Sequence, residues 1–312
     1  MVLGTAAAAV LAFDVGGTDI KAGLVDAQGN VLGMRRVPTP LDSARPGEAV
    51  LDRLADLADE LATEFPHVPA KAAGIIVPGI VDSVEGVGVY SANLGWRDFP
   101  FTVEAEKRLG LPVAFDHDVR SAAAVEHRFG ASHQFNEVVV MVVGTGIAAA
   151  VFSGGKAVKA GGFAGELGHA QVPDPASGGV TILEAIGSAG AITRRYNAQS
   201  PDPVGGAREV LARARGGEPL AARTWQEAVD ALAFTICQCV NIIGTEAVVI
   251  GGGLAEAGDE LLEPLRQKVD HALDFQRRPR IIKAQLGQDA GLLGAALNAR
   301  ALLDRSLVGG AQ

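Results

Sequence analysis

Two glycine-rich segments that carry a threonine hydroxyl are the parts of this sequence best suited to hold phosphate. Asp14-Val-Gly-Gly-Thr18 follows one apolar run, with Lys21 three residues beyond it, and Gly144-Thr-Gly146 follows another. Consecutive glycines let backbone N–H groups converge on one anion. One such loop is equally compatible with a tight hairpin, but two at corresponding places predict a phosphate clamp with two lobes. We expect Lys21 to stabilise phosphate charge and Asp14 to lie near Mg²⁺ or its waters.

A third glycine cluster, Gly251-Gly-Gly-Leu254, follows the apolar run 248–250 and precedes a predicted helix. It suits a flat backbone surface for a ring or a helix N-terminus for a phosphate, and it is also typical of a plain strand-to-helix turn. The sequence contains no G-x-x-x-x-G-K-[ST] segment, which excludes a Walker-type NTPase.

Apolar periodicity predicts an α/β protein with these loops at the ends of strands. In the first part of the chain we expect strands over residues 8–15, 20–26, 31–37, 72–77 and 112–115, and helices over residues 46–65, 102–109 and 118–129. In the second part we expect strands over residues 137–143, 147–152 and 247–250, and helices over residues 220–243, 259–269 and 291–303. Residues 201–217 are predicted to be a flexible surface connection.

The strand–loop–strand pattern around the first phosphate loop recurs around the second, which is a weak internal repeat. It predicts two related α/β domains with a ligand cleft between them. The expected small domain comprises residues 1–117 and about 291–312 and carries the first loop. The expected large domain, residues 118–290, carries the second loop.

The composition indicates a globular protein without a nucleic-acid or membrane partner. The 312 residues are 48% hydrophobic and 20% charged, which supports a large core and excludes disorder. The net charge of −9 disfavours nucleic acid, and the arginine pairs at 35–36, 194–195 and 277–278 form no local basic patch. No apolar run reaches the ~18–20 residues of a membrane span. The apolar start, residues 1–13, has no Lys or Arg and predicts a buried strand rather than a signal peptide.

The two cysteines, Cys237 and Cys239, lie two residues apart in a predicted helix. That spacing directs them to different faces of the helix, so we expect neither a disulfide nor a metal pair. A reduced cytoplasm suits this pattern.

Seven motifs, in order and at matching separations from about residue 10 to 300, resemble the ROK family (repressors, ORFs, kinases). They are Asp14-Val-Gly-Gly-Thr-Asp-Ile-Lys21-Ala-Gly, Val77-Pro-Gly-Ile-Val-Asp82, Asn93-Leu-Gly-Trp96, Phe115-Asp-His-Asp118, Gly144-Thr-Gly-Ile147, Gly165-Glu-Leu-Gly-His169 and Ile250-Gly-Gly-Gly253. The resemblance implies a two-domain, actin-like (hexokinase or ribonuclease H-like) fold that uses ATP and Mg²⁺. It implies phosphorylation of a hexose hydroxyl, C6 of glucose or of a glucose-like sugar.

The resemblance also implies roles for individual residues. Asp118 would be the catalytic base, since a carboxylate can orient the attacking hydroxyl and accept its proton, although a plain helix N-cap is the alternative for this position. The implied sugar contacts are Gly79, Asn93, His117, Asp118, Glu166, His169 and Glu184. The implied nucleotide contacts are Asp14, Gly16, Gly17, Thr18, Lys21, Gly144, Thr145, Gly146, Gly252, Gly253 and Leu254.

The sequence departs from the family pattern at a zinc site. Many relatives hold a structural zinc through the His of G-x-x-G-H and three cysteines that follow it. This chain keeps His169 and Glu184, but no cysteine lies between them and Pro173-Asp-Pro-Ala-Ser-Gly-Gly179 fills a shortened gap. We therefore predict no structural zinc, and a proline-rigidified loop in its place.

Two further departures flank Asp118. Similar kinases usually have Asn before this Asp, where it contacts a sugar hydroxyl around C3 or C4, and this chain has His117. The imidazole is compatible with a modified hexose, such as a 3-amino sugar, and with unchanged glucose binding. Two positions after Asp118, where Asn is frequent, the chain has Arg120, for which Asp116, Glu126 or a phosphate are the candidate partners.

Three alternatives to a glucose kinase stay open at the level of sequence. One is a kinase for an amino sugar or N-acetylhexosamine, for example 3-amino-glucose, and another is a non-catalytic sugar sensor. Polyphosphate in place of ATP is the third, since some relatives without zinc use it. Only 13 residues precede Asp14, too few for the DNA-binding domain of repressor members, and the resemblance implies a homodimer.

Overall fold

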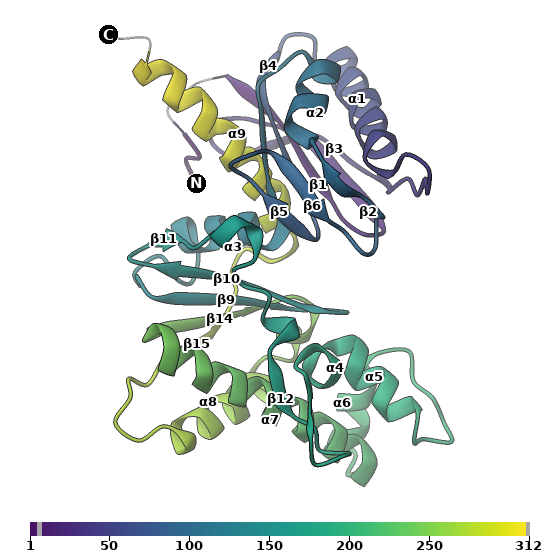
Figure 1. The fold of residues 1–312 in the computed structure, drawn as a ribbon, viewed down its shortest axis with the longest axis vertical. Coiled ribbons are helices and arrows are strands. Elements are labelled where there is room, and N and C mark those ends of the chain that lie inside the picture. The colour runs from purple at the N-terminus through teal and green to yellow at the C-terminus, as the bar shows by residue number, and fades with distance from the viewer. Residues whose placement is uncertain (5–7, 310–312) are drawn as a thin grey trace. The chain divides into compact units, whose positions relative to one another are not determined.

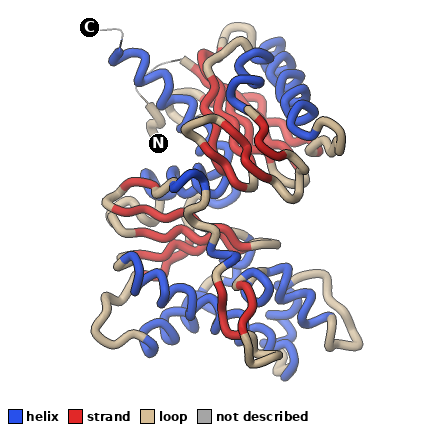
Figure 2. Tube along the Cα trace, in the orientation of Figure 1, coloured by secondary structure: helices blue, strands red, loops and turns tan. Residues whose placement is uncertain are grey.

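The computed structural model describes residues 1–4 and 8–309, which form two compact units (Figure 1, Figure 2). Unit 1 is the described part of Met1–Phe129, Lys159–Phe163 and Gln288–Gln312, and unit 2 is Gly130–Val158 with Ala164–Gly287. Each unit combines one five-stranded sheet with helices, as the predicted α/β class requires.

The sheet of unit 1 has the strand order β3-β2-β1-β4-β8. Its strands are β1 (Ala9–Val15), β2 (Asp19–Val25), β3 (Val31–Pro38), β4 (Ala70–Val77) and β8 (Val113–His117). The pairs β1–β2 and β2–β3 are antiparallel, whereas β1–β4 and β4–β8 are parallel. All five predicted strands are confirmed. Residues 5–7 of the apolar start, where a buried strand was expected, lie outside the described residues.

Helices cover both faces of this sheet (Figure 1). Alternate residues of β1, such as Leu11 and Phe13, pack into one core with α1 (Pro46–Glu64) and α2 (Phe101–Leu109). On the opposite face α9 (Ala290–Gly309) lies so close to β4 that a Cβ on Gly74 would come within 1.9 Å of the Ala295 carbonyl oxygen. The glycine is therefore a requirement of helix–sheet packing.

The sheet of unit 2 repeats this topology in the order β11-β10-β9-β14-β15. Its strands are β9 (Val138–Val143), β10 (Ile147–Ser153), β11 (Lys156–Ala157), β14 (Ala247–Gly251) and β15 (Arg280–Lys283). The antiparallel hairpin β9–β10 corresponds to β1–β2, and the parallel strands β14 and β15 correspond to β4 and β8. The predicted internal repeat is confirmed, and β15 is an element that the sequence patterns missed.

The helices of unit 2 pack with its sheet around a single core. They are α4 (Glu184–Gly187), α5 (Ala189–Asn197), α6 (Ala207–Arg215), α7 (Pro219–Ile243) and α8 (Asp259–Ala272). The prediction of a surface connection over residues 201–217 is wrong, because α6 occupies most of it. Ala207, Val210 and Leu211 have helical spacing and are buried, but glycine pairs on both sides of α6 disguise the pattern.

Short strands form two small additional sheets. A three-stranded antiparallel sheet consists of β5 (Ile80–Asp82), β6 (Val87–Tyr90) and β7 (Arg97–Phe99), and a hairpin consists of β12 (Gln171–Pro173) and β13 (Val180–Ile182). The proline-containing segment expected to be a rigid loop is thus the turn of the β12–β13 hairpin. Four 3₁₀ turns complete the described elements: η1 (Ala160–Gly162), η2 (Leu167–His169), η3 (Gly253–Ala257) and η4 (Gly287–Asp289).

The helix α3 (Asp118–Phe129) belongs to unit 1, whereas the expected boundary at 117/118 assigned it to the other domain. Its backbone approaches α9 closely, since a Cβ on Gly294 would lie 2.6 Å from the Ser121 carbonyl group. Asn298 Nδ2 also donates a hydrogen bond of 2.8 Å to Ser121 Oγ. These contacts hold Asp118 in the same unit as the first phosphate loop.

The close approach of α9 to β4 predicts a specific sensitivity to one methyl group. We expect Gly74→Ala to destabilise the protein by about 1–3 kcal/mol, because its Cβ meets backbone that cannot rotate away. Gly23→Ala is the matched control in the same sheet: its Cβ meets the Val31 side chain, which can move. Urea unfolding midpoints measure both effects, and equal midpoints for the two variants would contradict this packing.

Candidate active site

Two carboxylates from distant parts of the sequence lie at the carboxyl edge of the unit 1 sheet. Asp14 is in β1, and Asp118 directly follows the end of β8 at His117. Since β1, β4 and β8 are parallel, their carboxyl ends meet at this edge, where ligands bind in open α/β sheets. The two carboxylates are near enough that the charge of Asp118 raises the pKa of Asp14.

The Asp118 carboxyl has the electrostatics of a general base for neutral pH. Burial raises its pKa to about 7, against the opposing effects of a hydrogen bond from the Val119 N–H and the positive charge of Arg120. The Val119 N–H bond reaches Oδ1 at 2.6 Å. Yet 28% of the Asp118 side chain is exposed, so a substrate hydroxyl can approach it. A carboxyl with this pKa exchanges protons readily near pH 7.

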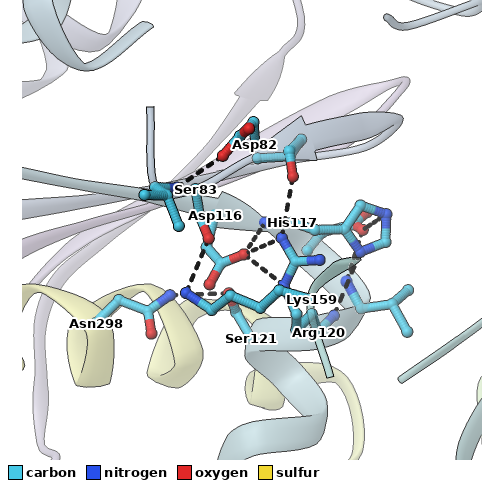
Figure 3. A network of polar contacts seen from close by, with 12 residues as sticks. Asp82, Ser83, Asp116, His117, Arg120, Ser121, Lys159 and Asn298 are labelled. Atoms are coloured by element: carbon cyan, nitrogen blue, oxygen red, sulfur yellow. Dashed lines mark hydrogen bonds and ion pairs between the residues drawn. The ribbon is translucent and has the colours of Figure 1, made fainter. Parts of the chain in front are cut away.

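The residues on either side of Asp118 form a buried polar network (Figure 3). Arg120, predicted to pair with Asp116, Glu126 or a phosphate, pairs with Asp116: its Nε and Nη2 lie 2.7 and 2.5 Å from Asp116 Oδ1. Its Nη2 also donates to the Val81 carbonyl at 3.3 Å. The arginine therefore ties the start of α3 to β8 and β5.

The imidazole of His117 is buried within the same network. Its Nδ1 accepts a hydrogen bond of 3.3 Å from the Arg120 N–H, and its Nε2 lies 3.3 Å from Asp118 Oδ1. His117 is thus the side chain that caps α3, the role considered above for Asp118. Both ring nitrogens, which were expected to face a sugar, face protein groups.

Asp14 lies beside a lysine on the neighbouring strand. Lys21 is opposite Asp14 in the β1–β2 register, and its Nζ is 3.6 Å from Asp14 Oδ2. Burial raises the pKa of Asp14 to about 6, although Lys21 lowers it. Gly291, in the first turn of α9, leaves room for this carboxylate, because a Cβ there would lie 2.4 Å from Oδ2.

The first phosphate loop joins β1 to β2 and is fixed from both sides. The Gly16 N–H donates to the Asp19 carbonyl at 2.8 Å, and the Thr39 hydroxyl donates to the Gly16 carbonyl at 2.7 Å. A Cβ on Gly16 would lie 2.9 Å from the Asp19 carbonyl oxygen, so the turn itself requires this glycine. At Gly17 a Cβ would meet nothing described within 4 Å. Gly17 and Thr18 are exposed, as a phosphate-binding role requires.

The second phosphate loop joins β9 to β10 in unit 2 in the same way. The Gly144 N–H donates to the Gly146 carbonyl at 2.9 Å, and the Ala189 N–H donates to the Gly144 carbonyl at 2.8 Å. Thr145 is exposed, like Thr18 in the first loop. Here too one glycine is open, since a Cβ on Gly144 would meet no described atom within 4 Å.

Three predicted sugar contacts lie around the start of β10. Glu184 Oε2 accepts a hydrogen bond of 2.7 Å from the Ile147 N–H, and a Cβ on Gly146 would lie 2.5 Å from that oxygen and displace the carboxylate. The turn that carries Glu166 and His169 packs on β10, where a Cβ on Gly168 would come within 2.3 Å of the Ile147 carbonyl oxygen. Glu166 is half-buried and His169 is exposed.

The other two predicted sugar contacts, Gly79 and Asn93, lie near the small β5–β6–β7 sheet of unit 1. Gly79 has φ = +111°, and a Cβ there would come within 2.2 Å of the Tyr90 carbonyl oxygen. Asn93 is exposed in a turn closed by the hydrogen bond from the Ser91 N–H to the Trp96 carbonyl, 3.1 Å.

The third glycine cluster leads from β14 into η3. Gly252 has φ = +80°, and a Cβ there would lie 2.5 Å from the Val143 carbonyl oxygen, so this close approach requires glycine. Gly253 is open, with no described atom within 4 Å of an added Cβ. Leu254 is buried in the core of unit 2, which leaves only its backbone for a nucleotide contact.

Sequence reasoning missed Thr39 and the capping role of His117. Thr39 lies just beyond β3 and reaches Gly16 only through the fold, so no local pattern marks it. The i,i+4 spacing of Asp116 and Arg120 was the available signal for the network around His117.

The described residues contain no group of three or more His, Cys, Asp or Glu side chains able to hold a metal ion. A Mg²⁺ that arrives with nucleotide needs only one or two carboxylates, or their contact with its waters, which Asp14 can supply. Cys237 and Cys239 are free and buried in α7. Among the described helices, none combines the length and the apolar character of a membrane span.

Curated relatives of this chain are sugar kinases. It is 31% identical to a glucokinase of Streptomyces coelicolor, in an alignment that covers 92% of this chain and 96% of the relative. It is also 31% identical to an N-acetylmannosamine kinase of Shigella flexneri, in an alignment that covers 93% of this chain and 98% of the relative.

Solved structures confirm the predicted actin-like sugar kinase fold. A ROK hexokinase from Thermus thermophilus matches with a TM-score of 0.80 and 32% identity, over 95% of this chain and 99% of that one. A ROK glucokinase from Streptomyces griseus, in complex with glucose and AMPPNP, matches with a TM-score of 0.76 and 28% identity. This match covers 94% of this chain and 99% of that one. The ROK family profile matches residues 10–301, and the chain therefore belongs to the ROK family.

Proposed function

We propose that this protein is an ATP-dependent hexokinase that phosphorylates the C6 hydroxyl of glucose or a glucose-like sugar. The observation that carries the proposal is Asp118, a partly exposed carboxylate with a pKa of about 7 at the carboxyl edge of the sheet that also bears a phosphate loop. The similarity to glucokinases, one of them bound to glucose and AMPPNP, supports this choice of substrates.

In the proposed reaction, Asp118 orients the sugar hydroxyl and accepts its proton while the hydroxyl oxygen attacks the γ-phosphorus. The bond from that phosphorus to the β,γ-bridging oxygen breaks, and ADP leaves. Lys21 and the backbone N–H groups of residues 17–18 and 145–146 stabilise the charge on the phosphates. Mg²⁺, when bound with ATP, would neutralise further phosphate charge, with Asp14 holding it or its waters.

We assign sugar binding to Gly79, Asn93, Glu166, His169 and Glu184, besides Asp118. A polar side chain left unpaired by the wrong sugar costs about 1–3 kcal/mol, which gives such a site its stereochemical selectivity. Adenine recognition is assigned to the backbone around Gly252 and Gly253. Free, buried thiols at Cys237 and Cys239 are in keeping with a reducing cytoplasm, and the family resemblance supports a homodimer.

A hexose panel with ATP tests the proposed function. We expect glucose to give the highest kcat/KM, with N-acetylmannosamine, 3-amino-glucose and other amino sugars below it, and ATP to surpass polyphosphate as donor. The 31% identity to an N-acetylmannosamine kinase makes that activity the second candidate. A preference for an amino sugar would select it, and no transfer to any sugar would overturn the assignment as a kinase.

Replacing the proposed base tests its role directly. We expect Asp118→Asn to lower kcat by about 10²–10⁴-fold and to leave KM for the sugar near the parent value, because general base catalysis acts in the transition state. Asp59→Asn, an exposed site on α1 in the same unit, is the control and should behave as the parent. Parent-like turnover by Asp118→Asn would rule out this role.

The raised pKa of Asp118 predicts opposite pH trends in activity and stability. Because the base must be ionised, kcat/KM should rise with pH to a plateau, with a midpoint at about 7. The folded state binds this proton more tightly than the unfolded state does. Protonation of Asp118 therefore contributes fully to stability at pH values below 3.8, the ordinary pKa of Asp. This contribution is lost as pH rises through about 7, the pKa in the folded state.

Melting temperatures across that range check the stability trend. Asp118→Asn, which has no proton to lose, should gain stability relative to the parent as pH rises from about 5 to 8. A difference between the two proteins that stays constant with pH would contradict the raised pKa.

A further inference from the structure

His117 contacts two different groups through its two ring nitrogens. Nδ1 accepts from the Arg120 N–H at 3.3 Å, so in the neutral ring the proton is on Nε2. Nε2 lies 3.3 Å from Asp118 Oδ1, and the side chain is 10% exposed. The capping bond therefore sets the tautomer that presents an N–H donor to the carboxylate of the proposed base.

The contacts that neighbouring residues make with the Asp118 carboxylate both reach the same oxygen. Oδ1 accepts the Val119 N–H at 2.6 Å and faces His117 Nε2. These two donors on Oδ1 restrict rotation of the carboxylate, and neither of them occupies Oδ2, which we infer to be the oxygen that accepts the substrate proton.

The backbone of His117 is held by the buried ion pair of Asp116 and Arg120 (Figure 3). Asp116 Oδ1 accepts from Arg120 Nε at 2.7 Å and from the His117 N–H at 2.7 Å. Arg120 is 5% exposed and also bonds to the Val81 carbonyl at 3.3 Å. These bonds fix the backbone from Asp116 to Arg120, and turning the ring on that backbone would break the bond from the Arg120 N–H to Nδ1.

We propose that His117 is the positioning residue of Asp118: it holds Oδ1 through Nε2–H and so aims Oδ2 at the sugar hydroxyl. The inference rests on the proposed kinase function. It gives His117 a role different from the sugar contact expected for this position, because both ring nitrogens are directed at protein groups. The charged groups in the run from Asp116 to Arg120 are Asp116, Asp118 and Arg120, and the wider network in Figure 3 also contains Asp82 and Lys159.

Two near-isosteric substitutions separate the two nitrogens. In His117→Asn the side-chain oxygen takes the place of Nδ1 and keeps the cap, but the shorter side chain places no donor near the Asp118 carboxylate. In His117→Gln the side-chain amide reaches the place of Nε2, but the cap is lost. We expect His117→Asn to lower kcat by about tenfold, the effect of one hydrogen bond to a charged group, with KM for sugar and ATP within about threefold of the parent.

The variants His117→Asn and His117→Gln should rank in the opposite order in stability from their order in kcat. His117→Gln should recover most of the lost kcat, to within about threefold of the parent, yet unfold at lower urea concentration than His117→Asn. His67→Asn, an exposed histidine of the same unit, is the control. An increase in KM for sugar at unchanged kcat would instead support the sugar contact and overturn the inference. Equal losses of kcat and stability in both variants would mean a purely structural residue and would overturn it as well.

A measurement without substrate keeps this test apart from that of the kinase function. A ¹³C-detected NMR titration follows the Asp118 carboxyl in the parent and in His117→Asn. Loss of the Nε2–H donor should raise the Asp118 pKa by on the order of half a unit to one unit, since a hydrogen bond to the charged form lowers a pKa. An unchanged pKa would overturn the positioning role, whatever the hexose panel shows.

Discussion

The desolvation of two neighbouring carboxylates is the constraint on which the candidate site of unit 1 depends. Asp14 and Asp118 lie at one edge of the sheet, burial raises the pKa of both, and the charge of Asp118 raises that of Asp14 further. Neighbouring groups offset this cost only in part: Lys21 lowers the pKa of Asp14, and the Val119 N–H and the charge of Arg120 lower that of Asp118. The incomplete compensation leaves Asp118 half-ionised near neutral pH, which is the state that suits a group that must take up a proton and release it again.

The glycines of the three loops serve two distinct physical needs. In one set an added Cβ would meet another group within 3 Å, which is backbone at Gly16 and Gly252 and the Glu184 carboxylate at Gly146. The other set has neither a positive φ nor a described atom near an added Cβ: Gly17, Gly144 and Gly253. We propose that the open glycines of these three loops allow a ligand to approach the backbone closely. Each loop contains one of each kind, and two of the loops occupy the same place in the repeated topology.

The sequence predicted the sheets well and the side-chain network poorly, for a physical reason. Strands such as β1 and β9 are buried on both faces and therefore appear as continuous apolar runs, and the loop glycines mark their ends. The helix α6 escaped prediction because its apolar positions lie between glycine pairs. The capping bond of His117 depends on the direction of one ring and on the amide of Arg120, and residue types alone do not encode that geometry. The boundary after residue 129 likewise depends on the packing of α3 against α9.

The two unusual residues beside Asp118 are best understood as one structural unit. Arg120 is too deeply buried to keep its charge without a partner, and Asp116 supplies that partner from the end of β8. The ion pair holds the first turn of α3 in place. In that turn the backbone N–H of Arg120 donates a hydrogen bond to His117 Nδ1. Because the amide orients the imidazole, and the imidazole faces Asp118, the arginine influences the base through two intervening hydrogen-bonding groups. The backbone N–H that orients the ring would be present with any residue other than proline at position 120, whereas the guanidinium holds the turn through Asp116, so the two residues support the site through separate bonds.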